Sequence, residues 1–514
     1  MEKILVLDFG GQYNQLIARR VRDHHVYAEI LPYTTPIETI KENGYKGIIF
    51  TGGPNSVFDM SSPHYTKDIL KLGVPVLGIC YGCQLIAWMG DGKVETAPIS
   101  EYGKIEVTVG ESKLFKDIPE KSVTWMSHTD YIAEPPKGYE IIAHTDDCPC
   151  AAMQNTQKNI YAVQFHPEVT HSEYGKEILH NFLYEICRCS GDWVMDNFIE
   201  NTVKSLREKI GDKNVILGLS GGVDSSVAAG LLSRAVGKQL TCVFVDQGLM
   251  RKDEGDFVEE TFTRLFDMNF VRVNCGDHFM QCLKGVTDPE QKRKIIGTEF
   301  YKVFWDEVRA RASEGYFAQG TIYPDRIESG KGKSAGKANT AVIKTHHNMV
   351  EKPKDINFID TIEPLGDLFK DEVRAVGEKL GIPHELVWRQ PFPGPGLGVR
   401  IIGEVTADKV KILQDADWVL RDEMSKNGYE SNLAQFFCVL PGVNSVGVMG
   451  DHRTYDNVVV IRAVTTDDFM TADWAKIPYD ILAKVSNRIT NECAHINRVV
   501  YDITSKPPGT VEWE

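Results

Sequence analysis

Short apolar runs that end in glycine-rich turns recur along this chain, and helical stretches separate them. The first series comprises residues 3–10 (KILVLDFG), 47–51 (GIIFT) and 75–79 (PVLGI). The second series begins after Gly191 and comprises residues 214–220 (NVILGLS), 240–246 (LTCVFVD) and 269–274 (NFVRVN). Apolar strands that alternate with helices pack as parallel sheets covered by helices. The pattern therefore predicts an α/β protein with two doubly wound, mostly parallel-sheet domains.

Other segments extend these two domains and indicate a third. Further strands are expected in the first domain at residues 104–109, 139–144 and 160–165, and a helix at 173–187 closes it; a helix at 192–210 opens the second domain. The prolines and glycines of QPFPGPGLG (390–398) disallow regular structure and mark a boundary. Beyond it, a helix at 406–426 and β-rich segments at 457–464 and 497–504 predict a smaller α+β domain. A chain of 514 residues is too long to fold around a single hydrophobic core. We therefore predict three domains, at residues 1–190, 191–389 and 390–514.

Composition excludes several classes of partner. The formal net charge of -15 argues against a general nucleic-acid surface or an anionic-membrane surface. No apolar run reaches the roughly 18 residues that a membrane span needs, and the first residues read as a strand instead of a signal peptide. We therefore expect a cytoplasmic protein. The eleven cysteines lack zinc-type spacing, and the close pairs Cys148–Cys150 and Cys187–Cys189 are expected to be free thiols.

One cysteine stands in a special local frame. Cys80 lies between Gly78 and Gly82, after an apolar run and before a helical one. Small flanking residues permit a tight turn that presents a nucleophile above a sheet, and the helix amino end favours a thiolate. His166 and Glu168, in the sequence FHPE, can act as a base and as the acid that orients it. The glycines of TGGPNSV (51–57) offer backbone N–H groups to an oxyanion.

These residues resemble the class I, or triad, glutamine amidotransferases over roughly residues 3–190. The resemblance implies that Cys80 attacks the side-chain amide of glutamine, with His166 as the base and Glu168 as the orienting acid. It also implies that backbone N–H groups of Gly53 and Tyr81 form the oxyanion hole.

A glycine-rich loop follows the strand at 214–220 and opens a helix. Its residues are Ser220, Gly221, Gly222, Val223, Asp224, Ser225 and Ser226. Backbone N–H groups and hydroxyls at such a helix start converge on an anion. The lysine of the common GxxxxGK[ST] phosphate loop is absent, and SGGVDSS resembles the loop of the ATP pyrophosphatases. That resemblance implies cleavage of ATP between its α- and β-phosphates, with Mg²⁺ as a cofactor whose ligands the sequence does not identify.

Five further motifs predict what is aminated. VDQGLMR (245–251), GYFAQGTIYPD (315–325), IKTHHN (343–348), QPFPGPGLGVR (390–400) and the tail from residue 496 resemble the GMP synthetase family. The resemblance implies that ATP adenylates O2 of XMP and that ammonia from glutamine displaces AMP to give GMP. It also implies a homodimer and XMP contacts by Arg251, Lys506 and Glu512. Chemically, Arg251 and Lys506 suit the phosphate, and Glu512 suits a hydroxyl or a ring N–H.

The segment around IKTHHN is expected to cover the triphosphate as a lid. Lys344, His346 and His347 are its candidates, with Lys331, Lys333 and Lys337 as possible helpers in a mobile loop. A metal site at the histidines is disfavoured, because adjacent histidines point apart. Two departures from the family pattern bear on the mobility of the lid and its coupling to glutamine hydrolysis: residues 349–353 (MVEKP) replace a VGGLP-like turn, and Arg326 replaces a small apolar residue.

Two rival functions remain open at this point. A glutamine-dependent NAD synthetase would share the phosphate loop, but its glutaminase belongs to another class, so the Cys80, His166 and Glu168 set speaks against it. A nucleotide-binding regulatory protein would retain the folds without catalysis. AMP formation from ATP with XMP and an ammonium salt separates these readings.

Overall fold

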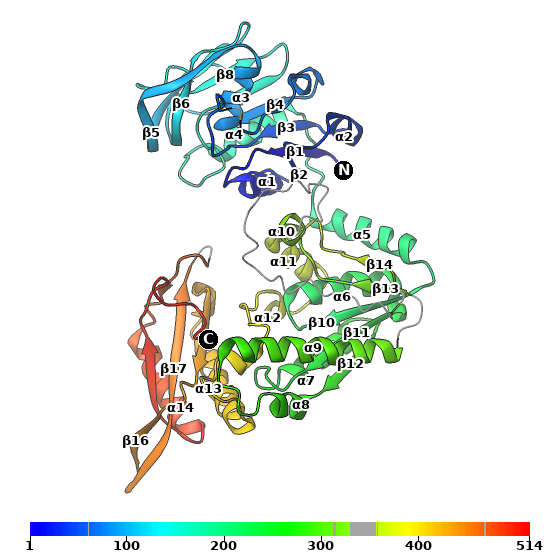
Figure 1. Ribbon diagram of the computed structural model, residues 1–514, viewed down its shortest axis with the longest axis vertical. Helices are drawn as coiled ribbons and strands as arrows, with labels where there is room; N and C mark the ends of the chain where they lie inside the picture. The colour runs from blue at the N-terminus through cyan, green and yellow to red at the C-terminus, as the bar shows by residue number, and fades with distance from the viewer. Residues whose placement is uncertain (60, 312–314, 329–355, 357, 467–468) are drawn as a thin grey trace. The chain divides into compact units, whose positions relative to one another are not determined.

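The computed structural model describes residues 1–514 except residues 60, 312–314, 329–355, 357 and 467–468. The described residues form two compact units (Figure 1). The first contains residues 1–200 and 323–328, and the second contains residues 201–322, 356 and 358–514. No described helix is both long enough and apolar enough to cross a membrane.

The first unit is built on a nine-stranded sheet with the order β2-β1-β3-β4-β9-β8-β7-β5-β6. The five strands from β2 to β9 in this order are parallel, and the remaining strands pair antiparallel. The strands are β1 (Lys3–Asp8), β2 (Tyr27–Pro32), β3 (Gly47–Phe50), β4 (Val76–Ile79), β5 (Lys93–Val109), β6 (Lys121–Glu134), β7 (Glu140–His144), β8 (Ala152–Asn155) and β9 (Ile160–Val163).

Helices follow most of the parallel strands, as the alternating sequence pattern requires. They are α1 (Asn14–Asp23), α2 (Ile37–Asn43), α3 (Tyr81–Met89) and α4 (Gly175–Asn181), followed by a π-helical turn η3 (Phe182–Ile186). Two further helices are α5 (Met195–Ile210), which starts in this unit, and α10 (Tyr323–Glu328). Residues 4–7 of β1 and 48–50 of β3 are fully buried, because helices cover both faces of a parallel sheet.

The second unit contains a five-stranded parallel sheet with the order β12-β11-β10-β13-β14. Its strands are β10 (Asn214–Leu219), β11 (Leu240–Asp246), β12 (Asn269–Asn274), β13 (Gly315–Ala318) and β14 (Phe358–Ile362). Its helices are α6 (Val223–Val236), α7 (Glu254–Leu265), α8 (Gly276–Cys282), α9 (Pro289–Arg311), α11 (Lys370–Lys379) and α12 (His384–Val387). The chain order reverses beside β10, and ligands bind at such switch points in open α/β sheets.

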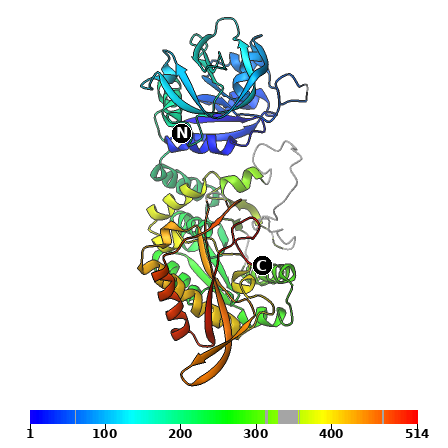
Figure 2. The ribbon, with the colours of Figure 1, turned by 90° about the vertical axis from the view of Figure 1, so that its left-hand side faces the viewer.

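A second sheet completes this unit. In it, β17 (His452–Thr465) pairs antiparallel with β15 (Gln435–Val439), β16 (Asn444–Met449) and β18 (Asp473–Trp474), and parallel with β19 (Ile496–Asp502). Helices α13 (Ala407–Lys426) and α14 (Tyr479–Glu492) pack together beside it. Figure 1 and Figure 2 both show the β16–β17 hairpin projecting from the body of the unit.

Short 3₁₀ turns link several elements. They are η1 (Lys67–Lys71), η2 (Lys113–Phe115), η4 (Gly237–Gln239), η5 (Gly396–Val399) and η6 (Glu430–Asn432).

The predicted fold class is confirmed: two doubly wound sheets precede a smaller region with antiparallel strands. The sequence boundary placed at residue 390 lies inside the second compact unit, because one hydrophobic core contains residues from both sides of it. That core joins Leu249, Phe279 and Ile296 to Leu397 and Leu420. Several strands were not predicted, including β2, the whole of β6 and β13. The three-part division itself stays a prediction.

Candidate active sites

Cys80 occupies a strained turn between β4 and α3. Its φ of 53° lies in a region that residues other than glycine rarely adopt. The two flanking glycines are required by close backbone approaches. A Cβ on Gly78 would lie 2.6 Å from the carbonyl oxygen of Gly82, and a Cβ on Gly82 would lie 2.5 Å from that of Phe50. The turn leaves the thiol at the amino end of α3, where the helix dipole favours a negative charge.

His166 and Glu168 follow β9 and reach the same place. Their side chains are almost fully buried, and His166 Nδ1 lies 2.7 Å from Glu168 Oε1. The backbone around His166 is fixed by its own N–H to Trp125 O at 3.0 Å and by the Ser172 hydroxyl, which donates to His166 O at 2.6 Å. Burial opposes the charge on the imidazole, but hydrogen bonds to Cys80 and Glu168 outweigh it and raise the pKa of His166 to about 10. The site therefore favours an imidazolium beside the sulfur.

A pocket of about 560 Å³ opens above the sulfur, which we call the Cys80 pocket. Its lining includes Gly53, Cys80, Tyr81, Gln84 and His166, together with residues 10–13 and the stretch 127–130 in the middle of β6. The backbone N–H groups of Gly53 and Tyr81 have no hydrogen-bond partner in the described part of the chain. Free donors beside a nucleophile can stabilise an oxyanion. The volume is in the range that small ligands occupy in proteins.

The loop Ser220–Ser226, here called the phosphate loop, lies between β10 and α6. Gly221 has a φ of 73°, which the turn requires. Ser225 and Ser226 donate to the Gly222 carbonyl at 3.1 and 2.7 Å, and the hydroxyls of Ser220 and Ser225 are 3.1 Å apart. A Cβ on Gly320 would lie 3.0 Å from Ser225 N, so the segment after β13 closes on the loop. The loop thus presents a helix amino terminus with hydroxyls at an anion-binding position.

Two cations beside this loop were missed by sequence reasoning. Lys370 Nζ lies 2.7 Å from both carboxylate oxygens of Asp224. Arg389 donates to the Gly221 carbonyl and forms an ion pair with Glu254. Neither cation belongs to a phosphate-loop motif, and each comes from a segment more than 140 residues away. Where the Walker lysine is absent, the fold therefore brings two cations to the loop, each paired with a carboxylate in the described structure.

Arg389 also begins a set of four arginines that we call the arginine cluster: Arg251, Arg389, Arg400 and Arg421. Two of them lie on the Phe392 ring, with guanidinium carbons 4.5 Å from its centroid for Arg251 and 5.3 Å for Arg400. Arg251 Nε and Nη2 are buried without a hydrogen-bond partner among the described residues. Burial and the nearby charges of Arg421 and Arg389 lower the pKa of Arg251. Such an arrangement suits an anionic ligand.

Glu512 and Arg251 are brought to the same cluster, whereas Lys506 contacts neither in the described residues. Arg400, which is fully buried, holds both carboxylate oxygens of Glu512 at 3.0 and 2.8 Å. Lys506 Nζ instead donates to Phe469 O at 2.6 Å. The lid candidates Lys344, His346 and His347 lie outside the described residues, as do Lys331, Lys333 and Lys337 and the MVEKP segment. Arg326 lies in α10.

The thiols of all eleven cysteines are free, including the pairs Cys148–Cys150 and Cys187–Cys189. Burial raises the pKa of Cys148 and Cys150 to about 12.

Family profiles match three parts of this chain. The profile described as glutamine amidotransferase class-I matches residues 5–186, which contain the Cys80 pocket. The NAD synthase profile matches residues 195–291, which contain the phosphate loop. The profile for the GMP synthase C terminal domain matches residues 422–513.

Curated relatives match the chain from end to end. The protein named GMP synthase (glutamine-hydrolyzing) from Ruminiclostridium cellulolyticum is 59% identical over 514 residues, which is all of this chain and 99% of the relative. The proteins of the same name from Acetivibrio thermocellus and Clostridium botulinum strain Kyoto are 59% and 58% identical over the same shares of both chains.

Proposed function

The chain belongs to the family of glutamine-hydrolysing GMP synthases, and from this premise we propose which of its residues perform each half of the reaction. The enzyme makes GMP with nitrogen taken from glutamine. In the first half, Cys80 attacks the side-chain amide carbon of glutamine. Gly53 and Tyr81 donate their backbone N–H groups to the oxyanion that forms.

His166 moves the protons of this half-reaction. It gives a proton to the departing nitrogen, so that ammonia leaves and a thioester of Cys80 remains. A water molecule, deprotonated by His166, then hydrolyses the thioester to glutamate and frees the thiol. Glu168 holds the imidazole by the 2.7 Å bond at Nδ1 and stabilises its charged form.

The second half takes place in the other unit. Oxygen O2 of XMP attacks the α-phosphate of ATP, pyrophosphate leaves, and ammonia then displaces AMP from the purine carbon to give GMP. The phosphate loop Ser220–Ser226 holds the phosphates by backbone N–H groups and hydroxyls. Lys370 and Arg389 supply positive charge beside the loop. Mg²⁺ bound together with ATP would neutralise negative charge on the phosphates. We assign it no protein ligand, because Asp224 is paired with Lys370.

XMP is held by Arg251, Lys506 and Glu512. The unpartnered nitrogens of Arg251 suit the XMP phosphate. Lys506 adds a second cation to the phosphate, and Glu512, fixed by Arg400, accepts from a hydroxyl or a ring N–H. Lys344, His346 and His347, which lie outside the described residues, keep their predicted role at the triphosphate. We keep the predicted parts 1–190, 191–389 and 390–514, with the XMP contacts drawn from the last two.

The assembled protein is a cytoplasmic homodimer in this proposal. Eleven free thiols suit a reducing compartment. The projecting hairpin exposes Val446, Val448 and Tyr455 on one face, with exposed fractions of 51%, 75% and 64%. Exposed apolar patches of this kind mark protein interfaces. Sedimentation analysis should therefore give a dimer, and a Val448→Asp variant should weaken it.

The observation that carries the proposed function is the presence, in one chain, of a Cys80–His166–Glu168 site in the first unit and, in the second, a phosphate loop with Arg251, two of whose buried nitrogens have no partner in the described part of the chain. The decisive experiment follows ATP by phosphorus NMR with XMP and either glutamine or an ammonium salt. Both nitrogen sources should give AMP and pyrophosphate with GMP. ADP and orthophosphate as primary products would contradict the adenylation step, and no turnover with XMP would favour a regulatory role.

A further inference from the structure

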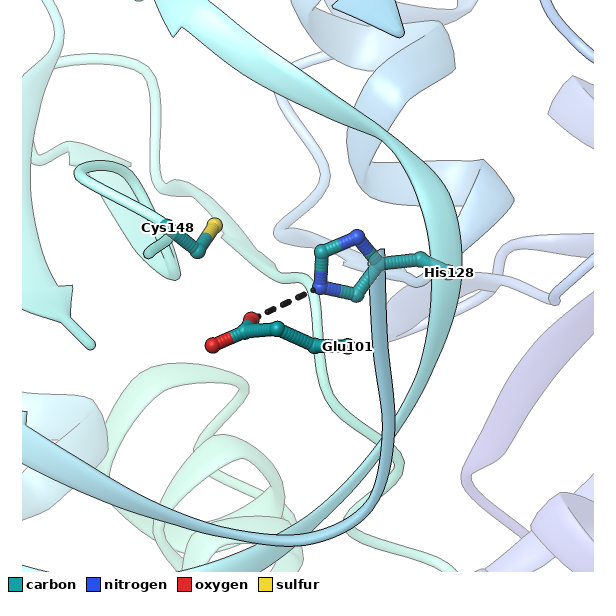
Figure 3. A group of neighbouring side chains, drawn as sticks. All are labelled: Glu101, His128 and Cys148. Atoms are coloured by element: carbon teal, nitrogen blue, oxygen red, sulfur yellow. Dashed lines mark hydrogen bonds and ion pairs between the residues drawn. The ribbon is translucent and has the colours of Figure 1, made fainter. Parts of the chain in front are cut away.

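A second histidine–carboxylate pair lies in the first unit, outside the Cys80–His166–Glu168 set. Glu101 of β5 and His128 of β6 face each other across the antiparallel ribbon, and both side chains are at least 96% buried. Figure 3 shows the imidazole of His128 pointing at the carboxylate of Glu101, with the thiol of Cys148 beside them. None of the steps described above uses this pair.

The hydrogen bonds of the pair require one shared proton. His128 Nδ1 lies 3.0 Å from the carbonyl oxygen of Asp130, which can only accept, so Nδ1 carries a proton. His128 Nε2 lies 3.0 Å from Glu101 Oε2. The hydroxyl of Thr145 donates to the other oxygen, Oε1, at 2.5 Å. One proton between Nε2 and Oε2 completes the set, on either atom. All polar atoms of both side chains are then satisfied in a buried position.

The Glu101–His128 hydrogen bond lies at an irregular point of the β5–β6 ribbon, where the two strands need an additional contact. Thr96 pairs with Asp130, but the next paired residues are Glu101 and His128, so β5 carries extra residues at this point. A bulge of this kind removes ladder hydrogen bonds and leaves the register locally unsupported. The Glu101–His128 bond closes the ribbon at the border of the bulge.

The same stretch forms a wall of the Cys80 pocket. Residues 127–130 all line that pocket, and Ser127 O lies 3.8 Å from Cys80 Sγ. The Asp130 carbonyl that accepts from His128 also accepts from Gln84 Nε2 at 2.8 Å. Gln84 in turn contacts Gln164 Oε1 at 3.3 Å. The buried pair is thus connected by hydrogen bonds to side chains that lie beside the sulfur.

A metal site is the other reading of this cluster, since ligand atoms of Glu101, His128 and Cys148 lie within 4.8 Å of one another. The contacts favour a hydrogen-bonded cluster without a metal ion. The imidazole nitrogens and both carboxylate oxygens already have partners, and burial raises the pKa of the Cys148 thiol to about 12. A metal ion would have to displace these bonds and deprotonate the thiol.

We propose that Glu101 and His128 are positioning residues for glutamine hydrolysis. Their buried hydrogen bond, supported by the hydrogen bond from Thr145, holds residues 127–130 of the pocket wall in place and keeps the Asp130 carbonyl bonded to Gln84. The side-chain amide of bound glutamine is thereby placed at Cys80. The inference rests on the proposed glutaminase role of that pocket. It concerns placement of the substrate, and leaves the reactivity of the sulfur to His166 and Glu168.

The test compares Glu101→Ala with Glu101→Gln. Glutamine can keep both bonds, because its amide NH₂ can donate to neutral His128 Nε2 while its oxygen accepts from Thr145. We expect Glu101→Ala to lower kcat/KM for glutamine by about tenfold or more, chiefly through KM. Glu101→Gln should stay within about threefold. Synthesis from ammonia should be unchanged in both. The control is Glu106→Gln, which breaks an exposed ion pair to Lys121 in the same ribbon and should have no effect.

Two alkylating reagents separate positioning from a general loss of structure. Iodoacetamide is too small to need the pocket wall, so its rate with Cys80 should be the same in Glu101→Ala and wild type. A glutamine-like diazoketone needs the wall, and its rate should fall with kcat/KM. In the wild type, labelling by this reagent must abolish glutamine use and spare ammonia use, or the proposed function of the pocket is itself wrong.

Three results would overturn the inference. They are unchanged glutamine kinetics in Glu101→Ala, equal slowing with both reagents, and a Glu101→Gln variant as impaired as Glu101→Ala. The last result, with bound zinc in the purified wild type by elemental analysis, would indicate a metal site. If Glu101→Ala does not fold, Thr145→Val removes the donor to Glu101 with little change of shape, although the N–H groups of Asp147 and Cys148 also lose their acceptor. It must then show the same difference between the reagents.

Discussion

The Cys80 pocket and the arginine cluster differ in which buried polar groups they leave without partners. Around Cys80 the side chains of His166, Gln84 and Gln164 have partners before any substrate is present, and among the described residues of the triad only the outer carboxylate oxygen of Glu168, Oε2, is buried without one. In the arginine cluster, Arg251 Nε and Nη2 and Arg400 Nη1 are buried without partners among the described residues. A covalent site must hold its nucleophile in one geometry beforehand, whereas a site for an anion can leave charge to be paired by the ligand.

The two sites should therefore fail differently. Damage in the first unit should remove one nitrogen source, because ammonia bypasses glutamine hydrolysis. Damage in the second unit should affect synthesis from both sources. Variants of the two units can therefore be told apart by whether synthesis is lost from glutamine alone or from both nitrogen sources.

Replacing Cys80 should give the sharpest separation. Cys80→Ala removes the nucleophile, so glutamine-dependent synthesis should fall by about 10⁴-fold or more, while synthesis from an ammonium salt stays near the wild-type rate. Steady-state assays with each nitrogen source measure both. Cys282→Ala, which changes a half-buried thiol of the second unit, is the matched control and should affect neither. Loss of both activities in folded Cys80→Ala would end the two-site description.

Replacing Glu168 should come next in size. Glu168→Gln removes the charge that stabilises the imidazolium, so glutamine-dependent kcat should fall by about 10³-fold and ammonia use should persist.

The same variant tests the charge state of His166. Its folded pKa of about 10 lies above the ordinary value of 6.5. The charged pair therefore stabilises the fold fully below pH 6.5, and this contribution is lost as the pH rises through 10. Thermal unfolding should show a larger difference between wild type and Glu168→Gln at pH 6 than at pH 10. A difference that does not change with pH would mean that the imidazole is neutral in the folded protein.

The two sites also differ in how far the sequence predicts them. The Cys80 turn depends on neighbours within a few residues, because Gly78 and Gly82 permit the backbone approach that the turn needs. The pairing of Glu101 with His128 joins strands 27 residues apart at a bulge, and β6 was not predicted. The alternating polar pattern of β6 does not predict that β6 pairs with β5 or that His128 is buried between them.

The second site shows the same limit. The phosphate loop is a local motif, but Lys370 and Arg389 reach it from distant segments, and neither residue belongs to a motif that predicts this contact. Glu512 was predicted as a ligand from the family resemblance of the tail. The ion pair between Glu512 and fully buried Arg400 was not predicted, because the two residues lie far apart in the sequence and no local pattern connects them.

Replacing Arg251 should affect both nitrogen sources. Arg251→Ala removes the unpartnered guanidinium, and the loss of charged hydrogen bonds to the XMP phosphate should lower kcat/KM for XMP by about 100-fold. The kcat/KM of Arg251→Lys for XMP should lie between those of Arg251→Ala and wild type, because lysine keeps the charge but lacks the planar set of N–H donors of the guanidinium. The neighbouring Lys252→Ala breaks a surface ion pair with Asp415 and serves as the control. An Arg251→Ala variant with normal XMP kinetics would place the phosphate elsewhere.

The smallest effect is expected at Lys506, and the structure determines how to test it. Deleting residues 505–514 should strongly raise KM for XMP and reduce synthesis from both sources, while a glutamine-like label still reacts with Cys80. However, deletion also removes Glu512 from Arg400 and Glu514 from Lys292, two fully buried cations. Leaving such charges unpaired costs about 3–5 kcal/mol each, so the truncation mixes binding with stability.

Lys506→Ala avoids that mixture, because the backbone of Lys506 exchanges two hydrogen bonds with Ala472, at 2.7 and 3.0 Å, and needs no side chain to stay in place. A phosphate contact from a partly exposed lysine predicts about a tenfold rise in KM for XMP. Glutamine hydrolysis should not change. Lys476→Ala, at an exposed lysine of the same region, is the control. Equal XMP kinetics in the two variants would remove Lys506 from the site and leave Arg251 to bind the phosphate.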